Sequence, residues 1–60
     1  MNTVELVRRR AWHSLSPQTA AAANMSLDQL QQFLLHGFTP SQQQIAALAR
    51  RFGIREEHVA

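Results

Sequence analysis

Apolar residues recur at every third or fourth position through most of the 60-residue chain, the spacing that places them on one side of a helix. The clearest stripe, in residues 40–52, consists of Ile45, Leu48, Ala49 and Phe52. A shorter stripe, in residues 27–35, consists of Leu30, Phe33 and Leu34. No segment alternates apolar and polar residues with the period of two that is typical of strands. The pattern therefore predicts an all-α fold.

Polar side chains mark the positions where the helices should begin. Asn2 and Ser26 are each followed three residues later by Glu or Gln, which is the arrangement of a capping box. After Ser16 and Thr39 comes a proline, which loses no N–H donor at a first helical position. We predict a compact bundle of four to five short helices, at about 3–13, 17–23, 27–35, 40–52 and 55–59.

Three residues should end the second, third and fourth helices. Asn24 follows the second helix, and Gly37 and Gly53 follow the third and fourth. Asn and Gly are the residues that most readily adopt the left-handed backbone conformation of a helix C-terminus. We expect Gly37 to supply the reversal after the third helix, and Ile54 to fold back onto the core after the fourth.

The turn between the second and third helices is very short, because only residues 24–26 separate them. Two helices joined so closely must cross at a steep angle, as in a helix-turn-helix that presents one helix to a DNA groove. Ala20 has a small side chain that would let the next helix approach. We expect Ala20 to touch Leu30 across this bend, with the Gln-rich side of the third helix left exposed.

Length and composition indicate one domain, residues 1–60. There is no cysteine, hence no disulfide and no thiolate metal site, which fits a reducing cytoplasm. The longest apolar run, residues 33–35, is far shorter than the roughly 20 residues that cross a bilayer. The apolar segment of a signal peptide is missing after the arginines at 8–10. We expect a soluble, cytoplasmic protein without a membrane partner.

The charges lie near the two ends of the chain. The formal net charge is +2, and the six basic residues are all arginines, at 8–10, 50, 51 and 55. Between residues 11 and 49 the only formal charge is Asp28. This balance excludes a histone-like polycation but permits a nucleic-acid binder with a few phosphate contacts.

Residues 15–59 resemble the helix-turn-helix domain of phage repressor and Cro proteins, the lambda-repressor-like family. Ala20 stands at the small residue between the crossing helices, Asn24 at the usual glycine, and Leu30 at the apolar anchor of the recognition helix. Residues 45–54 resemble the fourth helix of the family with its closing glycine. The resemblance implies a small transcriptional regulator, a repressor, that binds double-stranded DNA sequence-specifically and works as a two-fold homodimer.

The resemblance also places the beginning of the third helix in the major groove. The base contacts that it implies are Leu27, Asp28, Gln29 and Gln32. A glutamine amide can pair with adenine at N7 and N6, and a leucine can lie against a thymine methyl group. The alternative for the glutamines is a solvated helix face, and Gln29 can instead close the capping box of Ser26.

Phosphate contacts are expected where helices begin, because the free N–H groups and the helix dipole favour an anion there. The phosphate contacts that we predict are Ser16 and Gln18, Gln31 at the side of the third helix, Thr39, Ser41 and Gln42, and Arg10 and Arg8. For Arg50, Arg51 and Arg55 the favoured interpretation is stabilisation of a helix C-terminus by its dipole. For a dimer interface, Phe38 is the apolar residue of interest, alongside Leu35 and Val59, with capping of the domain's own core as the alternative.

An enzyme is not expected. His13, His36 and His58 lie in different elements, and the chain has no H-E-x-x-H motif and no glycine-rich phosphate loop. We therefore assign no catalytic residue, no metal and no cofactor. The alternative function is a protein-interaction module on the same bundle, such as an antitoxin, anti-repressor or assembly adaptor, which the low net charge and Asp28 favour. A membrane-surface peptide is disfavoured because capped short helices indicate a globular core.

Overall fold

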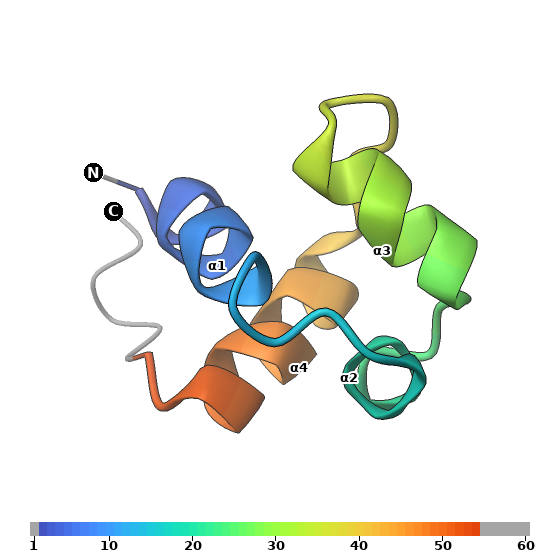
Figure 1. The fold of residues 1–60 in the computed structure, drawn as a ribbon. Helices are drawn as coiled ribbons and strands as arrows, with labels where there is room; N and C mark the ends of the chain where they lie inside the picture. The colour runs from blue at the N-terminus through green and yellow to red at the C-terminus, as the bar shows by residue number, and fades with distance from the viewer. Residues whose placement is uncertain (1, 55–60) are drawn as a thin grey trace.

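The computed structural model describes residues 2–54, and within that range it contains helices and loops but no strand (Figure 1). The helices are α1 (Thr3–Ala11), α2 (Pro17–Ala22), α3 (Leu27–Leu34) and α4 (Gln42–Phe52). The predicted all-α bundle is thereby confirmed. The helix predicted at 55–59 lies outside the described residues.

Each of the four helices begins at a side chain that caps it. The N–H of Glu5 donates to Asn2 Oδ1 at 2.9 Å, and the N–H of Thr19 donates to Ser16 Oγ at 3.2 Å. At α3 and α4, Ser26 and Ser41 form complete capping boxes with the glutamines three residues further on. Capping therefore defines the starts of the helices through local side-chain bonds, as the sequence predicts for α1, α2 and α3.

The predicted start of α4 is wrong by two residues. Ser41, not Thr39, is the N-cap, and the helix begins at Gln42 rather than Pro40. Both hydroxyl residues have a glutamine three positions later, so the local signal is the same for each. Pro40 is buried in the loop that precedes the helix. Burial of the proline ring therefore decides between two otherwise equivalent caps.

The ends of α2, α3 and α4 share one hydrogen-bonding pattern, the Schellman motif. In each, the second residue after the last helical turn donates back into the helix: Met25 N–H to Ala20 O (3.0 Å), Gly37 N–H to Gln32 O (2.7 Å) and Ile54 N–H to Ala49 O (2.8 Å). The left-handed residues are Asn24 (φ 56°), His36 (φ 65°) and Gly53 (φ 74°). Helices α1, α2 and α3 each end one or two residues before their predicted ends.

Asn24 and Gly53 behave as predicted, but the prediction for Gly37 is wrong. The reversal after α3 is made by His36, which has the positive φ. Gly37 serves a different purpose, since a Cβ atom built there would overlap the Oε1 atom of Gln32. At Gly37 the side chain of Gln32 approaches the backbone closely, and a larger residue there would displace the end of that side chain.

Replacing His36 by glycine is expected to stabilise the domain by about 0.5–1 kcal/mol, because it removes the left-handed strain of a side-chain-bearing residue at a small entropic cost. For a domain of this size the midpoint of thermal unfolding should rise by roughly 2–8 °C. Gly53→Ala is the matched control: its Cβ would meet no atom within 4 Å, so its expected loss of about 1 kcal/mol is purely conformational. A lower midpoint for His36→Gly would contradict the strain assignment.

The core lies where α1 and α2 each pack against both α3 and α4 (Figure 1). Its buried members include Val7, Ala11, Ala20, Ala23, Met25, Leu30, Phe33, Leu34, Ile45, Leu48 and Ala49. Ala20 is 1% exposed and Leu30 is fully buried, so the two residues expected to meet across the bend both belong to this core. Ile54 is half-buried against it, as expected.

Candidate nucleic-acid interface

The side of α3 that faces away from the core is polar. Leu30, Phe33 and Leu34 are buried, and the remaining side chains of the helix turn outward. The outward residues are Asp28, Gln29, Gln31 and Gln32, all of which are exposed, and Leu27, which is half-buried. The structure thus gathers all four predicted base-contact residues, together with Gln31, on one eight-residue helix.

Gln29 closes the cap of α3. Its Oε1 accepts from the N–H of Ser26 at 3.0 Å, while its own N–H donates to Ser26 Oγ at 3.0 Å. The alternative that the sequence left open is therefore realised. Because Oε1 is occupied, the side chain of Gln29 offers its NH₂ group as a donor, and a two-bond contact with adenine would compete with the cap.

Gln32 occupies the other end of the exposed face. Its amide oxygen lies over the backbone of Gly37, and its backbone carbonyl accepts from the N–H of Gly37. Within residues 2–54 no capping bond engages this side-chain amide. Unlike Gln29, Gln32 therefore keeps both the donor and the acceptor of its amide for pairing with a base.

Asp28 gives the exposed face its only formal charge. It lies in the first turn of α3, where the helix dipole stabilises a carboxylate. The turn and both helices of the α2–α3 pair contain no arginine or lysine. The electrostatics of this surface are therefore neutral to weakly acidic, and any attraction to phosphate must come from groups outside α3.

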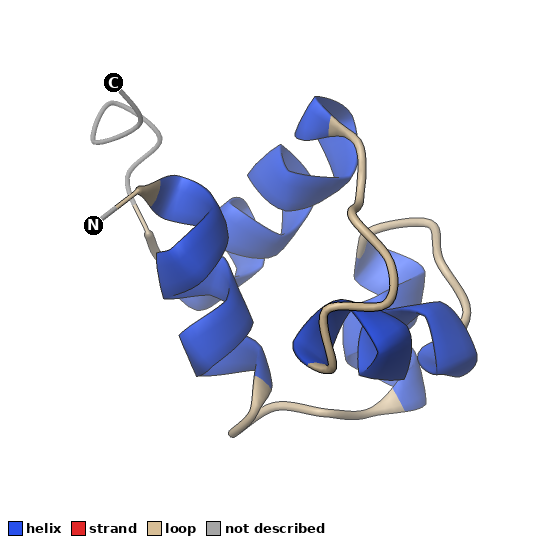
Figure 2. Ribbon diagram, turned by 90° about the horizontal axis from the view of Figure 1, so that it is seen from above, coloured by secondary structure: helices blue, strands red, loops and turns tan. Residues whose placement is uncertain are grey.

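The starts of α2 and α4 lie on opposite sides of α3 (Figure 2). At α4 the capping box uses the N–H groups of Ser41 and Gln44, which leaves those of Gln42 and Gln43 for an anion. At α2, Ser16 takes the N–H of Thr19 and proline has none, so the remaining helical donor is that of Gln18. Gln18, Ser41 and Gln42 are exposed, and Ser16 is half-buried.

Arg8 does not match its predicted role, whereas the phosphate contact of Thr39 stays a prediction. Thr39 is exposed in the loop two residues before the cap of α4. Arg8 has a side chain that is only 11% exposed: it pairs with Glu5, its Nε donates to Phe33 O at 3.1 Å, and its guanidinium lies 4.7 Å from the Phe33 ring centroid. Arg8 therefore joins α1 to α3, and we withdraw it as a phosphate contact.

Arg10 is exposed but lies far from the α3 surface. Its Nη2 donates to Phe52 O at 3.4 Å, at the C-terminal end of α4. That end and α3 occupy opposite sides of the molecule (Figure 1). The structure therefore places Arg10 apart from the glutamines of α3.

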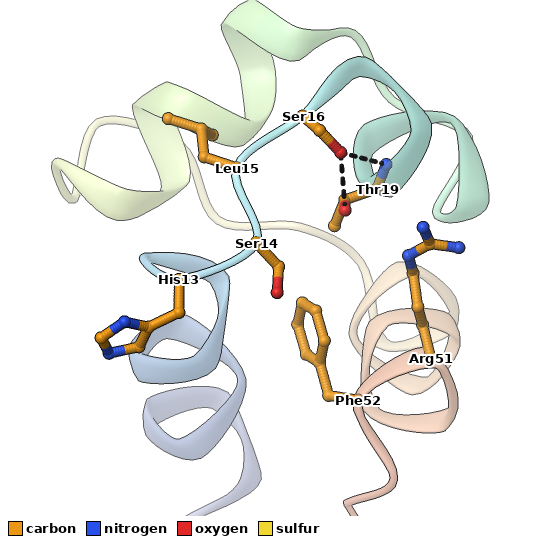
Figure 3. A pocket seen from close by; sticks show the side chains of 7 residues that line it. All are labelled: His13, Ser14, Leu15, Ser16, Thr19, Arg51 and Phe52. Carbon is orange, nitrogen blue, oxygen red and sulfur yellow. Dashed lines mark hydrogen bonds between the residues drawn. The ribbon is translucent and has the colours of Figure 1, made fainter.

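The structure also shows a pocket that the sequence did not predict, between the α1–α2 loop and the end of α4 (Figure 3). It has a volume of about 600 Å³ and is lined by His13, Ser14, Leu15, Ser16, Thr19, Arg51 and Phe52. No local signal could have found it, because Arg51 and Ser16 meet only through the packing of α2 on α4.

Comparison of the chain with models of known protein families, with curated proteins and with solved structures gave no match. Residues 2–54 contain no group of three or more side chains suited to holding a metal ion. None of the helices in this part of the chain has the length and apolar character needed to span a bilayer.

Proposed function

We propose that this protein binds double-stranded DNA in a sequence-specific manner, as a small transcriptional repressor that inserts α3 into the major groove. The observation that carries the proposal is the exposed polar face of α3, a helix that packs against α2 across a four-residue turn, residues 23–26. An α-helix with its side chains is about 10–12 Å across, which matches the roughly 12 Å width of the major groove. A helix of this size can present its first turns to base edges without clashing with the backbone.

Within this proposal the residues divide into two groups. Gln32 reads a base through its amide, Leu27 lies against a thymine methyl group, and Gln29 donates one hydrogen bond. The free N–H groups at the starts of α2 and α4 hold phosphates on either side of the groove. A homodimer on two half-sites about 34 Å apart would increase affinity, since one small module buries little surface.

Leu35 is the residue that we propose for the contact between the two subunits of the dimer. This residue is 65% exposed at the end of α3, whereas Phe38 is half-buried against the domain's own core. Val59, the third apolar candidate, lies outside the described residues. The alternative interpretation of Phe38 as a core residue is therefore the one that the packing supports.

A protein-interaction module is the second candidate function. It is favoured by one specific observation: the exposed face of α3 carries Asp28 and no basic side chain. A carboxylate at this position would be repelled by nearby phosphates but could pair with a basic group on a partner protein. The two functions differ in their dependence on salt.

Selection of bound sequences from random duplexes, followed by a salt titration of the best duplex, tests the proposed function. We expect an enriched two-fold symmetric motif and an affinity whose logarithm falls linearly with the logarithm of salt concentration. The double variant Gln31→Ala, Gln32→Ala should lose this enrichment while it keeps the fold, since both side chains are exposed. Failure of the wild-type chain to enrich any motif would contradict the proposal and favour the protein-interaction module.

A further inference from the structure

A second pocket lies between the start of α1 and the start of α4. Its volume is about 590 Å³, which is within the range of pockets that hold small molecules. Its apolar wall is formed by Val4, Pro40, Ile45 and Ala46, and its polar residues are Thr3, Thr39, Gln42 and Gln43. Among the described residues, none that lines this pocket carries a formal charge.

Two helix N-termini meet at this pocket, since the first two residues of α1 and the first two residues of α4 all line it. At each start the cap accepts from the third N–H group: Asn2 Oδ1 from Glu5 at 2.9 Å, and Ser41 Oγ from Gln44 at 3.2 Å. The first two N–H groups of each helix make no hydrogen bond within residues 2–54. The positive ends of two helix dipoles therefore favour an anion here.

The side chain of Thr3 is a separate indication of a ligand. Thr3 is 1% exposed, and its Oγ1 atom is buried without a hydrogen-bond partner in the described part of the chain. Buried polar groups in folded proteins nearly always have a partner. Because Thr3 lines the pocket, an anion oxygen bound there would supply that partner to the hydroxyl, which can donate a hydrogen bond.

We propose that this pocket binds a small carboxylic acid with an apolar body. The carboxylate accepts hydrogen bonds from the N–H groups at the two helix starts and from the hydroxyl of Thr3. The apolar body lies against Val4 and Ile45. A carboxylate fits this pocket better than a phosphate, because an apolar wall would leave further phosphate oxygens without partners.

The site stands apart from the proposed function, but one consequence of the site rests on that function. The N–H groups of Gln42 and Gln43 are the ones that the proposed function assigns to a DNA phosphate at the start of α4. A carboxylate bound to the same groups would exclude that phosphate. Acid and duplex should therefore compete, each lowering the affinity for the other by the same factor.

Titration of the full chain with hexanoate, followed by the amide chemical shifts in NMR spectra, tests the site. We expect a dissociation constant on the order of 1 mM or lower, with the largest shifts at the first two residues of α1 and of α4. Acetate lacks the apolar body and hexanamide lacks the charge, so both should bind about tenfold more weakly. Equal binding of either compound, or shifts confined to other parts of the chain, would overturn the inference.

Gln42→Pro and Gln42→Ala form a matched pair of variants. Gln42 is the first residue of α4, where proline is tolerated, and the extended backbone of Ser41 (φ −67°, ψ 166°) is compatible with a following proline. Proline removes the N–H group and alanine keeps it. Gln42→Pro should therefore weaken hexanoate binding about tenfold, while Gln42→Ala binds like the wild type. Equal affinities of the two variants would contradict the role of this N–H group.

Thr3→Val tests the hydroxyl without a change of shape. It should weaken hexanoate binding about tenfold, because the carboxylate loses one donor. It should also raise the midpoint of thermal unfolding, because a buried hydroxyl without a partner is replaced by a methyl group. Unchanged hexanoate affinity in this variant would remove Thr3 from the site.

The competition is measured by titrating the selected duplex with and without hexanoate at about ten times its dissociation constant, with acetate at the same concentration as the control. The affinity for the duplex should fall by up to about tenfold in hexanoate only. Hexanoate binding with an unchanged duplex affinity would overturn the competition and leave the site in place. If the wild-type chain binds no duplex at all, the proposed function fails, while the hexanoate titration still decides the site.

Discussion

Replacing Phe33 by alanine is expected to destabilise the domain by about 3–5 kcal/mol, the usual cost of removing a fully buried aromatic side chain. Phe33 is fully buried and is among the largest side chains of the core. A single core in a chain of this length rarely supplies more than about 3–5 kcal/mol of net stability. The variant should therefore be largely unfolded at 25 °C, as measured by far-ultraviolet circular dichroism and urea titration.

The effect should extend beyond the lost apolar area. The guanidinium of Arg8 lies over the Phe33 ring, so the variant also loses a cation–π contact between α1 and α3. Phe38→Ala removes the same ring from a half-buried loop position and should cost clearly less. A loss below about 1 kcal/mol for Phe33→Ala, or a larger one for Phe38→Ala, would contradict the described packing.

Replacing Gln32 by alanine is expected to weaken binding to the selected site by about 5- to 150-fold, which corresponds to the roughly 1–3 kcal/mol of one good base contact. Binding to random duplexes should stay nearly unchanged, because phosphate contacts supply essentially all non-specific affinity. Gln32 is exposed, so the stability of the variant should remain within about 0.5 kcal/mol of the wild type. Parallel titrations of both duplexes by fluorescence anisotropy measure the difference.

Gln43→Ala is the matched control for this experiment. Gln43 is also an exposed glutamine, but it lies in the first turn of α4 and outside the α3 surface. It should reduce the affinities for both duplexes little and equally. Equal losses for Gln32→Ala on the two duplexes would show that this amide does not read a base.

Phe33→Ala and Gln32→Ala test the two sides of the same helix, α3. Phe33 and Gln32 are neighbours in α3, yet one is fully buried and the other is exposed. The buried side holds the helix against α1 through Arg8, while the exposed side carries the proposed chemistry. A substitution of Phe33 therefore unfolds the helix that carries the proposed base contact, whereas a substitution of Gln32 removes only that contact.

The sequence by itself determined the helices and their exposed sides. The caps at Asn2, Ser16 and Ser26 and the left-handed residues Asn24 and Gly53 are predictable because their bonds join residues a few positions apart. The exposure of the α3 glutamines is predictable for a related reason. A helix that buries one stripe of apolar residues must turn its remaining side chains outward.

Only the tertiary structure determined those caps, chain reversals and side-chain partners for which the local sequence offered two equal candidates or none. Ser41 rather than Thr39 caps α4 where Pro40 is buried, and His36 rather than Gly37 reverses the chain because α3 ends at Leu34. Packing also determines the surroundings of the arginines: Arg8 contacts Phe33 of α3, and Arg51 lines a pocket. A long charged side chain can reach many partners, and only the crossing of the helices determines which one lies within its reach.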